Sequence, residues 1–193
     1  RRRREEAAVD GMSMPDRALR IILNAEGGLS NDPLDRGGLT NLGITQRTLD
    51  GWRRYHPEFP ASVRDLTVDH ARAIYERQYW QAAGCDFMPW PLSLAVFDMS
   101  VNSGPGTAIE YLQRALNSFG ARLRPDGGFG PLSQAALEAV LKAEGPLRIA
   151  LRLIDGRRDF YRAIVRNNPS QGRFLRGWLN RADRLERIVR QGE

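Results

Sequence analysis

Apolar residues recur at three- and four-residue spacing along most of this 193-residue chain, which is the period of an amphipathic α-helix. Clusters of glycine and proline separate one periodic segment from the next. Only residues 39–44, Leu-Thr-Asn-Leu-Gly-Ile, show the modest strand character that a hairpin needs. The pattern therefore predicts a mostly α fold with one small β-hairpin.

The ends of the predicted helices carry recognisable signals. The first helix is predicted from Pro15 to Ala25, and Thr45 and Thr67 are predicted to cap the next two. In the last helix, the spacing of the apolar residues places Phe174 and Trp178 on the inward face. The helices of the second half are expected over residues 91–103, 106–119, 147–165 and 172–190.

Composition excludes several classes of function. No apolar run approaches the roughly 18 residues of a membrane-spanning helix, so no membrane span is expected. The single Cys85 excludes an intramolecular disulfide framework. With only His56 and His70 besides this thiol, no metal-ligand cluster is expected either. We therefore expect the protein to need neither a metal nor another cofactor.

The chain is strongly basic, with a net charge of +6 and a pI near 10.2. This charge fits a polyanionic partner, such as the bacterial cell wall or DNA. However, the arginines do not gather on one recognition helix, and no nucleic-acid-binding motif is present. We therefore expect no nucleic-acid partner.

Glu26 is the first candidate for chemistry. It follows Leu19 and Ile22 at helical spacing, so a buried helix would carry another apolar residue at this position. Gly27 suits the residue after a helix, which places Glu26 in the last helical turn. Burial and the negative end of the helix would both raise the pKa of this carboxyl and keep it protonated. We expect Glu26 to act as a general acid, the alternative being an exposed residue at a frayed helix end.

A polar, glycine-rich loop follows Glu26 and supplies a second carboxylate. Asp35 is flanked by arginine and glycines, so we expect it to be solvated and ionised. Thr40, Asn41 and Thr45 are candidates to hold a water or a sugar hydroxyl. A protonated acid opposite an ionised carboxylate is the arrangement that hydrolysis of a glycosidic bond requires. The alternative for Asp35 is a turn-capping role.

Three blocks of this region together resemble the signature of the glycoside hydrolase 108 family: residues 26–28 (Glu-Gly-Gly), 32–38 (Asp-Pro-Leu-Asp-Arg-Gly-Gly) and 40–45 (Thr-Asn-Leu-Gly-Ile-Thr). Members of this family are peptidoglycan-cleaving muramidases of phage endolysins and of secretion-associated loci. The resemblance implies a lysozyme-like fold with Glu26 as the catalytic acid, supported by Asp35 and a threonine. Thr40 is the first candidate for that threonine, but whether Thr40, Asn41 or Thr45 orders the water stays open.

The second half of the chain carries two weaker resemblances. The end of the 91–103 helix resembles the helix that lines the cleft of lysozyme-like folds, which implies that Asp98 and Asn102 face substrate. The alternative for Asn102 is a cap at the join to the next helix. The turn at residues 126–131, Asp-Gly-Gly-Phe-Gly-Pro, resembles a predicted peptidoglycan-binding domain, although a structural role is the simpler interpretation of its residues.

We therefore expect residues 1–14 to form a flexible leader, 15–101 a catalytic lobe and 102–193 a helical peptidoglycan-binding lobe. The activity implied is endolysin-type hydrolysis of the β-1,4 bond between N-acetylmuramic acid and N-acetylglucosamine. One alternative is a lytic transglycosylase that uses Glu26 as acid and then as base. The other is a non-catalytic wall-binding protein that assists secretion.

The expected partner is bacterial peptidoglycan, and the expected state is a monomer. Nothing in the sequence resembles a secretory signal, so we expect synthesis in the bacterial cytoplasm and action at the cell wall. A holin or another export route would then be needed to reach the wall.

Overall fold

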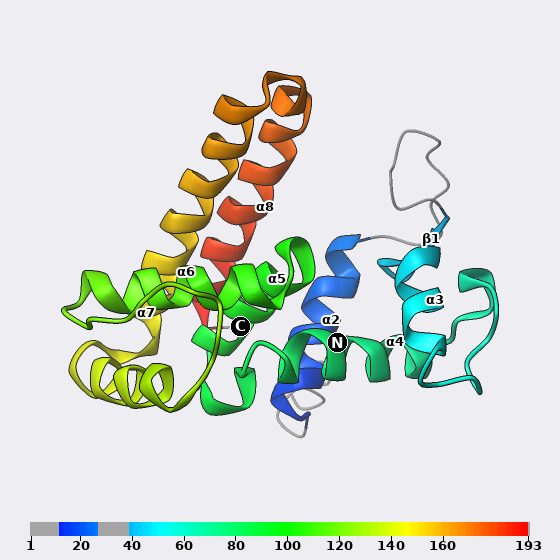
Figure 1. Ribbon diagram of the computed structural model, residues 1–193, viewed down its shortest axis with the longest axis horizontal. Helices are drawn as coiled ribbons and strands as arrows, with labels where there is room; N and C mark the ends of the chain where they lie inside the picture. Colours follow the sequence, from blue (N-terminus) through cyan, green and yellow to red (C-terminus); the bar gives the residue numbers. More distant parts are fainter. Residues whose placement is uncertain (1–11, 27–38, 193) are drawn as a thin grey trace. The chain divides into compact units, whose positions relative to one another are not determined.

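The computed structural model describes residues 12–26 and 39–192. Contacts divide the chain into two compact units, Arg1–Gln78 and Tyr79–Glu193. This division lies upstream of the predicted boundary between residues 101 and 102, so the helix at residues 92–103 belongs to the second unit. Each unit is described by itself below (Figure 1).

The first unit contains three α-helices and a hairpin among its described residues. The helices are α2 (Met14–Glu26), α3 (Gln46–Arg53) and α4 (Val68–Tyr75), and a 3₁₀-turn, η1 (Val63–Asp65), lies between the last two. Helix α2 starts at Met14, one residue earlier than predicted, because the Ser13 hydroxyl accepts a hydrogen bond from the Asp16 backbone N–H at 3.3 Å. Its residues Ala18, Leu19 and Ile22 are buried.

The predicted hairpin consists of β1 (Thr40–Asn41) and β2 (Ile44–Thr45), which pair antiparallel with Thr40 opposite Thr45. Leu42 and Gly43 form its two-residue loop with φ values of 51° and 73°, which is the pattern of a type I′ turn. A positive φ is unfavourable for leucine. The hydroxyl of buried Tyr75 donates to the Leu42 carbonyl oxygen at 3.0 Å and so holds this turn from α4.

Both predicted threonine caps are present. The Thr45 hydroxyl accepts from the Thr48 backbone N–H at 3.1 Å at the start of α3. Thr67 forms a capping box with His70, because each side chain binds the backbone N–H of the other residue. After α4 the chain continues as a π-helical turn, η2 (Glu76–Gln81), which the sequence pattern did not predict.

The second unit is built around α5 (Leu92–Ser103), in which every residue from Leu92 to Ser100 is buried. Helices α6 (Pro105–Ser118), α7 (Pro131–Asn167) and α8 (Gly172–Gln191) all pack against it. The short turns η3 (Cys85–Phe87) and η4 (Pro169–Gln171) complete the unit. A helix enclosed on all sides is apolar around its whole circumference, which explains why residues 92–101 are the most apolar part of the sequence.

Helix α7 contains a sharp kink. Gly145 has φ 75° and ψ 163°, and Pro146 follows it, so the hydrogen-bonding ladder breaks at this point. The part after the kink corresponds to the helix predicted over residues 147–165. It runs beside α8, as Figure 1 shows in orange and red.

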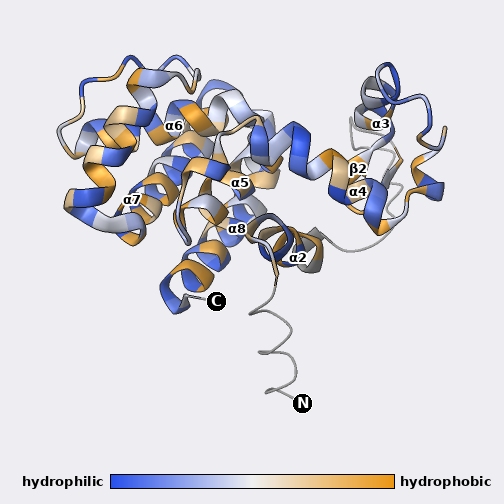
Figure 2. Ribbon diagram, turned by 90° about the horizontal axis from the view of Figure 1, so that it is seen from below, coloured by the Kyte–Doolittle hydropathy of each residue, from blue (hydrophilic) through white to orange (hydrophobic). Residues whose placement is uncertain are grey.

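The last helix, α8, is amphipathic, and its ribbon alternates hydrophilic and hydrophobic segments in Figure 2. Ala182, Leu185 and Val189 are buried along its inner face. Phe174 was predicted on this face, but its side chain is 40% exposed, and Trp178 is half-buried. The prediction for Phe174 is therefore wrong, because helical spacing alone does not say where along α8 the neighbouring helices stop covering it.

These elements make a mostly α, lysozyme-like fold with a single small β-hairpin among the described residues, as the sequence predicts. Of the helices that the structure describes, none combines the length and the apolar character needed to span a bilayer.

Candidate functional site

Glu26 is the last residue of α2, as the sequence predicts. Ile22, one helical turn earlier, and Leu19, two turns earlier, are both buried. Of Glu26 the structure describes the backbone only, and Asp35 lies outside the described residues. The roles predicted for these two carboxyl groups therefore stay predictions.

Asn41 and Thr45 make hydrogen bonds within the first unit. Asn41 Nδ2 donates to the backbone oxygen of Val63 at 2.8 Å, which joins the hairpin to η1. Thr45 Oγ1 caps α3 and lies 3.0 Å from Thr48 Oγ1. Thr40 faces Thr45 across the hairpin. Asn41 and Thr45 thus have structural roles, and the ordering of a water by any of the three stays a prediction.

Gln46 also makes side-chain hydrogen bonds within the first unit, a role that no sequence pattern predicts. Its Nε2 donates at 2.8 Å to both Asp50 Oδ1 and the backbone oxygen of Ala61. Its Oε1 accepts from the Val63 backbone N–H at 3.0 Å. One glutamine therefore ties α3 to the segment before α4. A side chain with both donor and acceptor groups suits this task, but no local motif marks it.

Asp98 on α5 lies in a buried polar cluster of the second unit. Its carboxylate accepts a hydrogen bond from Arg157 on α7, whose side chain is fully buried. Arg181 on α8 donates to the same carboxylate through Nη2 at 3.0 Å and Nε at 3.2 Å. Burial alone would raise the pKa of Asp98, but the positive charges of Arg157 and Arg181 outweigh it and hold the pKa below its ordinary value.

The prediction that Asp98 faces substrate therefore needs correction. Its side chain is 8% exposed, and both oxygens are engaged by guanidinium groups of the same unit. An ionised carboxylate between two buried or half-buried arginines offsets their charge. Asp98 has this internal role in place of the predicted contact.

Asn102 lies one helical turn after Asp98, at the exposed end of α5. The Tyr161 hydroxyl donates to Asn102 Oδ1 at 2.5 Å and accepts from Arg157 Nε at 2.5 Å. The Ser103 hydroxyl also donates to Oδ1, at 3.3 Å. The amide is thus oriented with its oxygen toward Tyr161, and Nδ2 has no hydrogen-bond partner among the residues that the structure describes. Its predicted contact with substrate stays a prediction.

The glycine-rich turn at residues 126–131 is held by the buried side chain of Gln113 on α6. Gln113 Nε2 donates to Asp126 Oδ1, Ser133 Oγ and the Gly128 oxygen at 2.9–3.1 Å. Its Oε1 accepts from the backbone N–H groups of Asp126 and Gly127 at 3.0 and 3.1 Å. These bonds support the structural interpretation of the turn.

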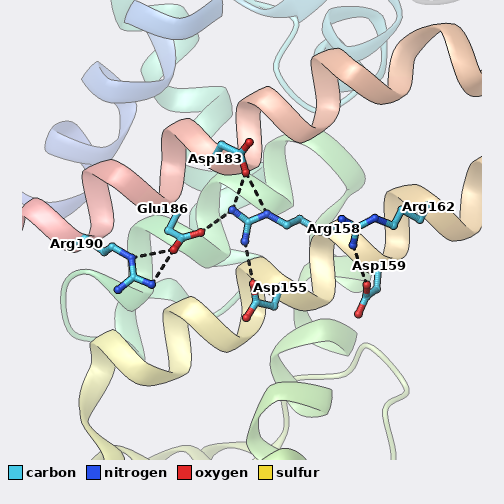
Figure 3. Close-up of polar contacts among 7 residues, drawn as sticks. All are labelled: Asp155, Arg158, Asp159, Arg162, Asp183, Glu186 and Arg190. Atoms are coloured by element: carbon cyan, nitrogen blue, oxygen red, sulfur yellow. Dashed lines mark hydrogen bonds and ion pairs between the residues drawn. The ribbon is translucent and has the colours of Figure 1, made fainter.

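A group of charged side chains joins α7 to α8 at the surface of the second unit (Figure 3). Arg158 on α7 donates to Asp183 Oδ1 at 2.7 Å and to Glu186 Oε2 at 2.5 Å, both on α8. Asp155, which lies on α7 like Arg158, accepts a hydrogen bond from the Arg158 guanidinium at 2.8 Å. These bonds and the Asp98 cluster fix how α7 and α8 pack.

Comparisons with known proteins agree with this architecture. Residues 19–104 match the model of the family described as glycosyl hydrolase 108, and residues 107–183 match that of a predicted peptidoglycan domain. The structure of Brucella abortus SagA is similar, with a TM-score of 0.75 and 29% sequence identity over 92% of this chain and 94% of that one. No match is found among curated proteins.

The two family matches meet between residues 104 and 107, close to the boundary predicted from the motifs. The family regions and the compact units thus divide the chain at different places. Residues 19–104 are thus a glycosyl hydrolase 108 region and residues 107–183 a predicted peptidoglycan domain, and together they support a peptidoglycan hydrolase.

Proposed function

We propose that the protein is a muramidase that hydrolyses the β-1,4 bond between N-acetylmuramic acid and N-acetylglucosamine, with Glu26 as the general acid. One observation carries this proposal: Glu26 ends α2, directly after two turns with buried apolar residues, inside the region that matches the hydrolase family. The C-terminal end of a helix disfavours a negative charge, so a carboxyl group at this position tends to stay protonated.

In the proposed reaction, the Glu26 carboxyl donates its proton to the glycosidic oxygen while the bond from that oxygen to the anomeric carbon breaks. Positive charge then develops on the sugar ring. Asp35, as an ionised carboxylate, stabilises this charge or orients the attacking water together with Thr40 or Asn41. Water adds to the anomeric carbon, and its proton leaves to a carboxylate. The chain's own side chains suffice for these steps, so no cofactor is required.

The predicted peptidoglycan domain in residues 107–183 supports peptidoglycan as the polymer that is bound as well as cut. We propose that the enzyme acts as a monomer at the cell wall, in the manner of an endolysin, after passage through a holin or another export route. The basic net charge of +6 favours approach to a wall that carries muramyl carboxylates.

Analysis of the products tests the proposed bond and reaction together. Purified peptidoglycan is digested, the products are reduced with borohydride, and the released muropeptides are identified by mass. Reduced N-acetylmuramic acid ends are the expected result. N-acetylglucosamine ends would show that the other glycosidic bond is cut, and 1,6-anhydro ends would identify a lytic transglycosylase. Wall binding without any product would leave a non-catalytic wall-binding protein.

A further inference from the structure

The second unit has an aromatic surface that the proposed chemistry does not use. Trp178 and Phe174 lie one turn apart on α8 with ring centroids 5.9 Å apart and planes inclined by 26°. Phe174 is 40% exposed, and Trp178 is half-buried. Arg173 lies over the Phe174 ring, with its guanidinium carbon 4.6 Å from the ring centre. We call Phe174, Trp178 and Arg173 the α8 platform.

Tyr161 connects the α8 platform to the exposed end of α5. Its ring stacks on Trp178 at a centroid distance of 5.3 Å, and its hydroxyl donates to Asn102 Oδ1 at 2.5 Å. Because Tyr161 is 2% exposed, it is a fixed support rather than a contact surface. A rigid aromatic face therefore lies beside an amide whose oxygen accepts from Tyr161 and whose Nδ2 has no acceptor among the described residues.

Flat aromatic faces and a few fixed polar groups are the usual features of a small-molecule binding surface. The apolar face of a pyranose ring packs on an aromatic ring, and the carbonyl oxygen of an N-acetyl group accepts from an amide N–H. The α8 platform and Asn102 offer these two groups together. Neither group alone would distinguish a sugar from another ligand.

An exposed positive charge lies on this surface. Arg173 is exposed and makes no ion pair among the residues that the structure describes. Its guanidinium therefore remains able to pair with an anionic group of a ligand.

We propose that the α8 platform and Asn102 form a binding subsite for the glycan strand of peptidoglycan. In this subsite an N-acetylhexosamine ring stacks on Phe174 and Trp178, Asn102 Nδ2 donates to an acetamido oxygen, and Arg173 pairs with the lactyl carboxylate of a muramic acid unit. Tyr161 is a positioning residue that orients Asn102. The subsite rests on the proposed function for its ligand, but it holds the strand whether or not the strand is cut.

Binding to intact peptidoglycan tests the subsite without requiring hydrolysis. The full chain carrying Glu26→Gln is sedimented with purified peptidoglycan over a range of protein concentrations. Phe174→Ala and Asn102→Asp are each added to this parent. Asn102→Asp keeps the acceptor for Tyr161 but loses the N–H donor. Each is expected to weaken binding by about fivefold or more, the scale of a binding hot spot.

Two controls distinguish loss of a specific subsite from loss of any exposed aromatic ring and from unfolding of the protein. Phe87→Ala removes another exposed aromatic ring of the second unit, 55% exposed, and is expected to leave the apparent Kd unchanged. Thermal unfolding of every variant is expected to match that of the parent, because Phe174 and Asn102 are exposed. Equal weakening by Phe87→Ala would overturn the proposal.

A second probe tests the pairing with the muramyl carboxylate. Soluble N-acetylglucosamine oligomers carry acetamido groups but no lactyl carboxylate. Arg173→Gln is expected to weaken binding to peptidoglycan several-fold and to leave binding to these oligomers unchanged. Unchanged binding of peptidoglycan by Phe174→Ala and Asn102→Asp, or no binding by the parent, would contradict the subsite. Tight binding by the parent with no products from the wild type would instead refute the muramidase alone.

Discussion

At the scale of single residues, Asp98 shows how a site can be misassigned from sequence. An acid on an apolar helix beside a predicted cleft is expected to face substrate. Its partners Arg157 and Arg181 lie 59 and 83 residues further along the chain, where a local pattern cannot reveal them. Glu26 is likewise predicted from features close to it in the sequence, an apolar helix face and a following glycine loop.

We expect Asp98→Asn to lower the free energy of unfolding by about 3–5 kcal/mol, because the substitution removes the carboxylate that pairs with Arg157. The Arg157 side chain is fully buried and cannot regain water without opening the structure. Urea unfolding at pH 7 measures the change. Asp159→Asn is a matched control, because that carboxylate is 73% exposed and pairs with Arg162 at the surface; its effect should stay within about 0.5 kcal/mol.

The same carboxylate predicts a pH dependence of stability. The pKa of Asp98 is lowered in the folded protein, so its contribution is fully present above the unfolded-state pKa of about 3.9. The contribution is lost as the pH falls from that value through the lower folded pKa. Between neutral and acid pH, the wild type should therefore lose more stability than Asp98→Asn. Parallel losses in the two proteins would mean that Asp98 does not titrate as its surroundings indicate.

At the scale of elements, helix ends were the most predictable features because their signals are local. Thr45 and Thr67 cap the helices that they are expected to cap. The hairpin follows from the glycine at position 43, which tolerates the positive φ that its turn requires. The π-helical turn at Glu76–Gln81 has no comparable signal, since it depends on how the flanking residues pack.

Two neighbouring glycines of the turn at residues 126–131 should respond differently to substitution. Gly127 has φ +76°, and a Cβ placed on it would lie 2.7 Å from the Gly106 carbonyl oxygen. Gly127→Ala should therefore lower the free energy of unfolding by about 2 kcal/mol or more. A Cβ on Gly128 would lie 3.4 Å from its nearest neighbour, Asp126 Oδ1, so Gly128→Ala should cost less than about 1 kcal/mol. Equal losses of stability in thermal unfolding of the two variants would contradict the close packing of Gly127 against Gly106.

At the scale of the whole molecule, sequence families and compact units divide the chain differently. The hydrolase match ends at residue 104, whereas the second compact unit begins at Tyr79. The difference is α5, which belongs to the hydrolase region by sequence and forms the buried centre of the second unit. The motifs place the boundary between residues 101 and 102, within the last turn of this helix, because they record family membership rather than packing.

Two fragments test whether the second unit needs α5 to fold. Residues 79–193 contain α5 and all three helices that pack against it, so this fragment should be helical and unfold cooperatively. Residues 107–193 lack α5 and leave Arg157 without its carboxylate partner, so this fragment should be largely unfolded or should unfold without a sharp transition. Circular dichroism during urea unfolding distinguishes the two. Cooperative folding of the shorter fragment would show that α5 is dispensable for the unit.

The proposed function depends above all on Glu26 as the acid of a peptidoglycan hydrolase. The most direct measurement compares the rate of product release from purified peptidoglycan by the wild type and by Glu26→Gln, a substitution of similar size without an acidic proton. Turnover by Glu26→Gln is expected to fall by at least about a hundredfold, the usual contribution of a general acid, with wall binding and thermal unfolding unchanged. Turnover by Glu26→Gln within a few-fold of the wild type would contradict this role and move the search for the acid elsewhere in the hydrolase region.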